Sequence, residues 1–244
     1  MQKEYQIQNV EPPVELPNPI LNLDIENMTY TQLKETVSGK TLTSSATESV
    51  LSFVNDSDYG RGYKILQNTN SVMYTQTYNR SNFPKLYDVF SNIQKSFSII
   101  LFLDVHSATS TSSRWGLGAV YNFCSLFGWS TGITWMSAHL RGFLNSQYGL
   151  GSAFVPMQNN VCFWYVGVSQ AYTAYYNTSN TYTTNTGVYR NQVQTQNGTL
   201  RINATQESYK PLPNVIVYGF TMYDDVLTDE QVQYLVRCKR TLPQ

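Results

Sequence analysis

The sequence has few charged side chains, which make up 13% of its 244 residues. Its 16 basic and 16 acidic residues cancel, which argues against a basic surface for nucleic acid and against an acidic disordered tail. Histidine is scarcer still: 2 residues leave little material for a zinc centre or for a histidine base. Apart from one calcium candidate, we expect no cofactor, and we expect no nucleic-acid partner.

Cysteine and long apolar runs are also scarce. The three cysteines, Cys124, Cys162 and Cys238, are widely spaced and predict free thiols in a reducing compartment, although a Cys124–Cys162 disulfide stays open. The longest apolar run, "FSIILFLDV", is too short to span a bilayer, and the opening "MQKEYQIQNV" lacks the pattern of a signal peptide. The sequence therefore predicts synthesis in the cytoplasm without membrane insertion.

Tyrosine, asparagine, threonine and serine are abundant, with 19 tyrosines in the chain. Tyrosine and threonine favour strands, and asparagine favours turns, so we expect an all-β protein. Residues 1–20, with four prolines and no periodicity, predict an extended arm, and residues 21–244 a single β-sandwich domain. A short helix is expected within 82–94, and the predicted strands are 20–24, 49–54, 62–66, 71–77, 97–105, 114–121, 133–140, 161–168, 187–194, 200–203 and 215–223.

The stretch "VIVYGFTMYDDVLTDEQVQYLV" near the C-terminus changes from a strand-like apolar run to helical spacing. Four carboxylates lie between the two parts: Asp224, Asp225, Asp229 and Glu230. The sequence "TDEQ" from Thr228 to Gln231 is a capping box, and acidic residues in a first helical turn complement the helix dipole. We interpret this acidic cluster as the start of a C-terminal helix and not as a site.

Several motifs, each degenerate by itself, occur together in the order found in one family. The run "SFSIILFLDV", the later "VCFWYVGVS" and the hairpin-like "VYRNQVQTQNGTLRIN" resemble strands of concanavalin A-like, laminin-G-like domains, and the strand-and-helix ending resembles the close of the same family. Asn191-Gln192 replaces the usual Asn-Gly of the hairpin, and a Tyr/Thr-rich insertion precedes it. The resemblance implies two antiparallel sheets packed as a jelly-roll sandwich with a short C-terminal helix.

The resemblance also implies a possible enzyme class, the glycoside hydrolases, whose members carry an acidic trio on one strand. No such trio occurs here; Asp24 and Glu26 offer only one pair at the required spacing. Neither His106 nor His139 lies near a recognisable nucleophile motif. We therefore expect no enzymatic activity and keep hydrolysis only as a minor alternative.

Two surface features are candidate sites. In "NDSDYGRG", Asp56 and Asp58 could contribute to a calcium site, but the further ligands of an EF-hand loop are missing and an ordinary turn is the favoured interpretation. In "ITWMSAHLRG", alternation predicts that Trp135, His139 and Arg141 project from the outer face of a sheet. Such a row could stack on a sugar or form a protein interface, or it could be an ordinary solvated face.

The insertion "AYTAYYNTSNTYTTNTGVY" contains no charge. Its tyrosines lie among small polar residues, the composition of antibody binding surfaces, and the candidates are Tyr172, Tyr175, Tyr176 and Tyr182. A long hairpin with cross-strand Tyr–Thr pairs is the alternative interpretation.

Together these features predict a non-enzymatic structural, decoration or adhesion subunit of a large assembly, in particular on a virion surface or in another extracellular assembly. A lectin-like module that binds cell-surface glycans is the alternative. We expect the arm to contact other subunits and the chain to form a homo-oligomer.

Overall fold

The computed structural model describes residues 14–92, 94–104, 195–203 and 210–243. Between residues 115 and 187 it describes the backbone of seven strands and, among their side chains, that of Cys162. The predicted positions Arg141, Asn191 and Gln192 lie outside the described residues, as do residues 1–13 of the expected arm.

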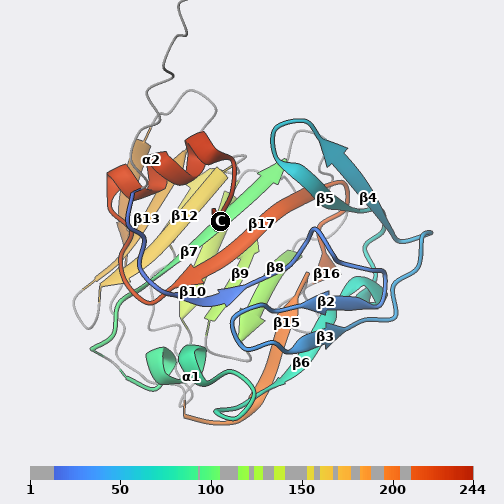
Figure 1. Ribbon diagram of the computed structural model, residues 1–244, viewed down its shortest axis with the longest axis horizontal. Helices are drawn as coiled ribbons and strands as arrows, with labels where there is room; N and C mark the ends of the chain where they lie inside the picture. Colours follow the sequence, from blue (N-terminus) through green and yellow to red (C-terminus); the bar gives the residue numbers. More distant parts are fainter. Residues whose placement is uncertain are drawn as a thin grey trace, which may run out of the picture.

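The chain folds into two large β-sheets (Figure 1). In the eight-stranded sheet the order is β14(Tyr182–Gly187), β13(Gln170–Tyr176), β12(Asn160–Val166), β7(Phe97–Asp104), β17(Ile216–Tyr223), β5(Gly60–Ile65) and β4(Leu51–Asp56), with β1(Pro19–Asn22) also beside β17. The nine-stranded sheet runs β11(Ala153–Pro156), β10(Trp135–Leu140), β9(Cys124–Gly128), β8(Trp115–Val120), β15(Gly198–Ile202), β6(Tyr74–Tyr78), β3(Thr41–Thr43) and β2(Gln32–Lys34), with β16(Lys210–Pro211) beside β8. Neighbouring strands are antiparallel except β16 and β8.

The main core lies between the two sheets. Ile99 and Leu101 of β7, in one sheet, belong to the same buried cluster as Leu200 and Ile202 of β15, in the other. Side chains alternate across a strand, so these β7 residues share one face. Full burial of each such side chain contributes about 1.5–3 kcal/mol, which makes this cluster the main reason that the sheets stay together.

A second cluster lies on the outer face of the eight-stranded sheet, under α2(Asp229–Cys238). Ile100 and Phe102, the other face of β7, are buried there with Cys162 of β12 and with Val232 and Leu235 of α2. Figure 1 shows α2 lying across this side of the sheet. Because both faces of β7 are covered, its apolar run is continuous instead of alternating.

The predicted capping box is confirmed. The Thr228 hydroxyl accepts a hydrogen bond from the Gln231 amide at 3.3 Å, and the Gln231 side chain accepts one from the Thr228 amide at 2.8 Å. At the other end Lys239 takes the left-handed conformation, with φ of 53°. Asp229 and Glu230 occupy the first turn, so their interpretation as helix-start residues holds.

The first described residues pack on the domain instead of leaving it. The Asn18 amide donates to a carboxylate oxygen of Asp224 at 2.9 Å, and the Asp224 amide donates to the Asn18 carbonyl at 2.9 Å. The Gln231 side chain of α2 donates to the Glu15 carbonyl at 2.7 Å. Residues 14–18 are therefore tied to β17 and α2.

Most predicted elements appear, including the short helix α1(Pro84–Phe90) within 82–94. Strands β2, β3, β9, β11 and β16 were missed, because they are two to five residues long and carry little alternation. The predicted strand 200–203 is confirmed as β15, which pairs with β6 and β8, whereas residues 188–194 of the expected hairpin lie outside the described residues. Cys162 and Cys238 are free thiols, as predicted. Among the described residues no helix is long and apolar enough to cross a bilayer.

Candidate functional site

The strand that carries the predicted aromatic row lies near one edge of the nine-stranded sheet. In β10, Trp135 pairs with Pro156 of β11, and His139 pairs with Ser125 of β9. Arg141 follows the strand and is outside the described residues.

The predicted tyrosine cluster lies on the hairpin formed by β13 and β14, at the edge of the eight-stranded sheet. Tyr172 is opposite Thr186, and Tyr175 is opposite Thr183. Tyr176 is opposite Tyr182, the last pair of the two strands. The hairpin with cross-strand Tyr–Thr pairs is therefore present, and it places all four predicted tyrosines on two adjacent strands.

The tertiary structure brings these two predicted features to the same end of the molecule. Strand β11 pairs with β10 on one side and also lies against β13 and β14 of the other sheet. Strand β10, which carries Trp135, is thus one strand spacing, about 4.8 Å, from β11, and β11 contacts the tyrosine hairpin. Nothing in the short sequence of β11, "AFVP", signals this role.

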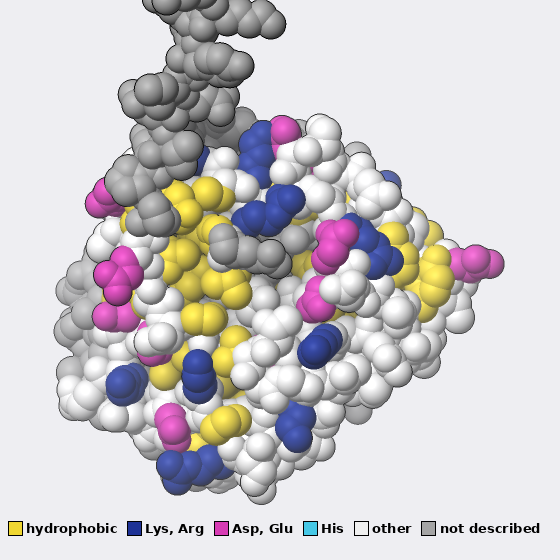
Figure 2. All heavy atoms as spheres, viewed as in Figure 1, with side chains coloured by type: hydrophobic (Ala, Val, Ile, Leu, Met, Phe, Trp, Pro, Cys, Tyr) yellow, Lys and Arg dark blue, Asp and Glu magenta, His cyan; other side chains and the backbone are white. Residues whose placement is uncertain are grey.

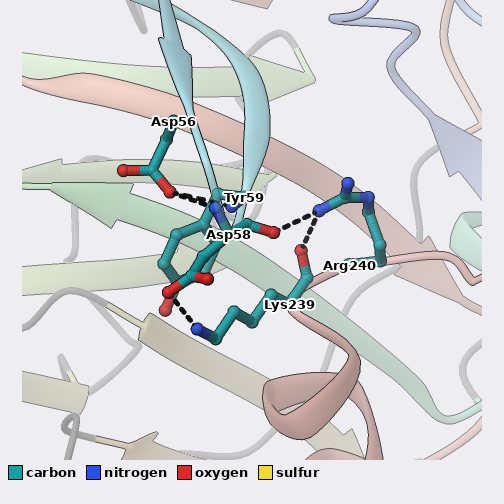
Figure 3. A network of polar contacts seen from close by, with 5 residues as sticks. All are labelled: Asp56, Asp58, Tyr59, Lys239 and Arg240. Carbon is teal, nitrogen blue, oxygen red and sulfur yellow. Dashed lines mark hydrogen bonds and ion pairs between the residues drawn. The ribbon is translucent and has the colours of Figure 1, made fainter.

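A second candidate surface surrounds the tip of the β4–β5 hairpin, where the predicted calcium ligands lie (Figure 3). One carboxylate oxygen of Asp56 accepts the amide hydrogens of Asp58 and Tyr59, at 2.8 and 2.9 Å. The Asp58 carboxylate pairs with the Lys239 ammonium, just after α2. Arg240 donates from Nη1 to the carbonyls of Asp58 and Lys239, at 3.0 and 2.8 Å. The hairpin tip is thereby joined to the C-terminal end of α2.

These contacts shift two pKa values in opposite directions. The amide of Tyr59, then that of Asp58, stabilises the Asp56 carboxylate and lowers its pKa below the usual value. Hydrogen bonding to the Asp58 carboxylate raises the pKa of Lys239 above its usual value. Among the described residues no group of three or more His, Cys, Asp and Glu side chains is placed to hold a metal ion. Calcium binding at Asp56 and Asp58 stays a prediction.

Aromatic side chains lie beside this network. The Tyr59 ring stacks on that of Tyr218, with centroids 5.1 Å apart, and meets Phe102 edge-on at 5.7 Å. The Lys239 ammonium lies 5.8 Å from the Tyr59 ring centroid. Burial, then the nearby charges of Asp56 and Asp104, raise the pKa of Tyr218. Sequence reasoning missed this cluster, because its members come from three distant segments.

On the opposite side of the hairpin, Arg61 lies over Phe53, with 4.0 Å from the guanidinium carbon to the ring centroid. Its Nη1 donates to the Glu26 carbonyl, and the Tyr30 ring packs on Phe53 at 5.1 Å. Asp24 accepts hydrogen bonds from the Asn27 amide and side chain, at 3.1 and 3.0 Å. The one acidic pair noted for hydrolysis thus lies in a turn in which Asp24 holds the backbone.

No family model matches the sequence, and no curated protein matches it either. Solved structures do share its fold. A botulinum neurotoxin DC binding domain in complex with SialylT aligns with TM-score 0.59 and 13% identity, over 91% of this chain and 52% of that one. A structure described as a receptor binding domain aligns with TM-score 0.62 and 12% identity, over 91% and 51%.

A third structure concerns cell entry of botulinum neurotoxin type C through two ganglioside molecules; it aligns with TM-score 0.51 and 11% identity, over 91% of this chain and 51% of that one. This chain therefore spans about half the length of the binding domains that it resembles. At this identity the likeness establishes a shared β-rich fold. The similar structures are binding domains and not catalytic ones.

Proposed function

We propose that the chain is a non-enzymatic, glycan-binding adhesion module built on a concanavalin A-like jelly-roll sandwich. Two antiparallel sheets with a C-terminal helix on one outer face agree with that architecture. Solved binding domains of this fold, described with SialylT and with gangliosides, support the same class of ligand.

The observation that carries the proposal is the meeting of β10 and the tyrosine hairpin through β11. Tryptophan and tyrosine offer flat apolar faces with one polar group, which suits the mixed apolar and hydroxyl surface of a sugar. Trp135 of β10 and the tyrosines of β13 thus belong to strands at one end of the sandwich, and Tyr172 and Tyr176 share one face of β13. The segment 171–187 contains no charged residue, and an uncharged, tyrosine-rich composition favours glycans or proteins over nucleic acid.

A glycan array probed with the wild-type chain and with Trp135→Ala tests the proposal. Binding to one glycan class, weakened at least about tenfold in Trp135→Ala, is expected if the ring stacks on a sugar. Leu66→Ala, which removes an exposed apolar side chain from the end of β5, is the control and should bind normally. Absence of wild-type binding to every glycan class would refute the function.

A second candidate function is a structural or decoration subunit of a larger assembly, such as a virion surface or another extracellular assembly. The anchoring of residues 14–18 by Asn18 and Glu15 favours it, because residues 1–13 then start from a fixed point. Light scattering of the full chain and of a variant lacking residues 1–13 tests this role. An oligomer that the truncation dissolves is expected, whereas two monomers would contradict it. Truncation through residue 20 is unsuitable, because Ile20 is buried.

A further inference from the structure

We propose that the tip of the β4–β5 hairpin, around Gly60, binds an uncharged pyranose of a glycan. The inference rests on the proposed function and adds a second position at which the sugar is held. It draws on Arg61 and Arg240, which were not predicted as site residues, and on Glu26, which the sequence offered only as half of a weak acidic pair.

Gly60 has no side chain, and a hydrogen-bond donor on Arg240 and an acceptor on Glu26 lie near the position that a Cβ atom would occupy. A Cβ atom at this position would lie 3.1 Å from Arg240 Nη2 and 3.8 Å from Glu26 Oε2. The backbone φ of Gly60 is +77°, so the turn favours glycine there. A sugar hydroxyl both donates and accepts, and adjacent hydroxyls of one ring can bind Arg240 and Glu26 together.

The guanidinium of Arg240 is held in place before any ligand arrives. Arg240 uses Nη1 for the carbonyls of Asp58 and Lys239, which orients the guanidinium with Nη2 next to Gly60. On the other side, the backbone carbonyl of Glu26 accepts a hydrogen bond from Arg61 Nη1, which fixes the main chain at Glu26 and not its carboxylate. Glu26 and Arg240 are nevertheless exposed, so a ligand can reach them. A preorganised site loses less conformational entropy on binding than a flexible one.

Half-buried aromatic rings lie on the two sides of the hairpin. Tyr59 precedes Gly60, and Phe53 is three positions along β4 from Asp56, the residue paired with Gly60. Tyr59, stacked on Tyr218, lies towards α2, and Phe53, beneath Arg61, lies towards the 24–30 turn. Aromatic edges and planes provide apolar contact for the C–H groups of a sugar ring, while the charged groups provide strong, oriented hydrogen bonds.

The charges around the tip favour an uncharged ligand. We call six charged side chains around the tip the hairpin cluster: the carboxylates Glu26, Asp56 and Asp58 and the cations Arg61, Lys239 and Arg240. The charges of the two groups balance. Figure 2 shows basic and acidic side chains interspersed on the face that includes α2, without a large area of one sign. The cations of the cluster would attract an anionic sugar, and its carboxylates would repel one, so a negative charge on the ligand brings no net gain.

The test measures the binding of neutral and sialylated oligosaccharides to the full chain by array and titration calorimetry. Glu26→Gln and Arg240→Gln should each weaken binding of a neutral glycan about tenfold, by removing one charged hydrogen bond. Glu26 is exposed and Glu26→Gln should keep the wild-type melting temperature, whereas Arg240→Gln also removes the hydrogen bonds to the Asp58 and Lys239 carbonyls and should lower it. Arg80→Gln is the matched control, because Arg80 forms an exposed ion pair with Asp88 at 3.1 Å, next to α1. It should bind as the wild type does.

The outcomes separate this inference from the proposed function. Wild-type glycan binding that Glu26→Gln and Arg240→Gln leave unchanged, but Trp135→Ala weakens, overturns the hairpin site and leaves the function standing. Binding restricted to sialylated glycans overturns the choice of an uncharged sugar. A wild-type chain that binds no glycan refutes the function itself.

Discussion

The ring of Tyr218 lies directly over Gly62, on the neighbouring strand. A Cβ atom at position 62 would be only 2.6 and 2.8 Å from Cδ1 and Cε1 of that ring, and 3.0 Å from the Val217 carbonyl. The missing side chain is therefore what allows Tyr218 to lie across β5 and to stack on Tyr59. One glycine in β5 positions an aromatic pair beside the hairpin cluster.

Gly62→Ala should destabilise the protein by about 1–3 kcal/mol, because the added methyl group must displace Tyr218 or the β17 backbone. Urea unfolding measures the change. In the double variant Gly62→Ala/Tyr218→Ala, the loss of unfolding free energy should be smaller than the sum of the losses in the two single variants. The reason is that the added methyl group no longer meets the Tyr218 ring. Additive effects would contradict the contact. Gly39→Ala is the contrast: φ is +73° there with no atom within 4 Å of a Cβ, so only backbone strain is expected.

Glu35→Ala should lower the free energy of unfolding by at least about 2 kcal/mol. The Glu35 side chain is fully buried, and it accepts hydrogen bonds from the amides of Asn22, Val37 and Ser38, at 2.8, 2.8 and 2.7 Å. Its loss leaves these donors without their partner at the junction of β1 and the β2–β3 turn. Urea denaturation gives the free energy of unfolding, with Thr36→Ala, an exposed neighbour, for comparison. A loss below about 0.5 kcal/mol would contradict the buried network.

Cys162 should resist thiol reagents in the folded protein. Its side chain is fully buried under α2, and burial raises the pKa of the thiol well above its usual range. The thiolate is the reactive form, so labelling should require displacement of α2 or unfolding. Half-buried Cys238 should react faster. Mass spectrometry after timed alkylation, followed by peptide mapping, measures both rates. Rapid native labelling of Cys162 would refute the placement of α2.

Thr228→Ala should cost about 1 kcal/mol of unfolding free energy, because it removes the side-chain acceptor for the first turn of α2. It should also speed the alkylation of Cys162, through more frequent opening of the helix. Thr228→Ser keeps the hydroxyl and should behave as the wild type. Equal alkylation rates in all three proteins would mean that α2 does not control access to Cys162.

Acid should lower the unfolding free energy of the protein by protonating Asp56 at the hairpin tip. Its pKa is lowered in the folded protein by the Tyr59 and Asp58 amides, so the ionised carboxylate stabilises the fold above its unfolded pKa, about 3.9. That contribution is lost as pH falls through the lower, folded-state pKa. Unfolding free energies measured from pH 6 to pH 2 should therefore fall more steeply in the wild type than in Asp56→Asn. Parallel curves would contradict this assignment.

Local features of the fold could be predicted from the sequence. The capping box at Thr228 depends on residues three positions apart, and the run Phe97–Asp104 identifies a strand covered on both faces. Such patterns depend on residues that are close together in the sequence, so they can be recognised without knowledge of the tertiary structure. The Tyr–Thr hairpin is of the same kind, because its two strands are close together in the sequence.

Which strands and side chains meet was decided only by the tertiary structure. Asp58 and Lys239 are 181 positions apart, and no periodicity relates them. Likewise, no local pattern in the sequence indicates that β15 pairs with β6 and β8. The sequence alone determined strand-rich composition, the helix at the end and the aromatic segments. Their assembly into two surfaces, at β10–β11 and around Gly60, followed from long-range pairing and from the packing of two shared cores.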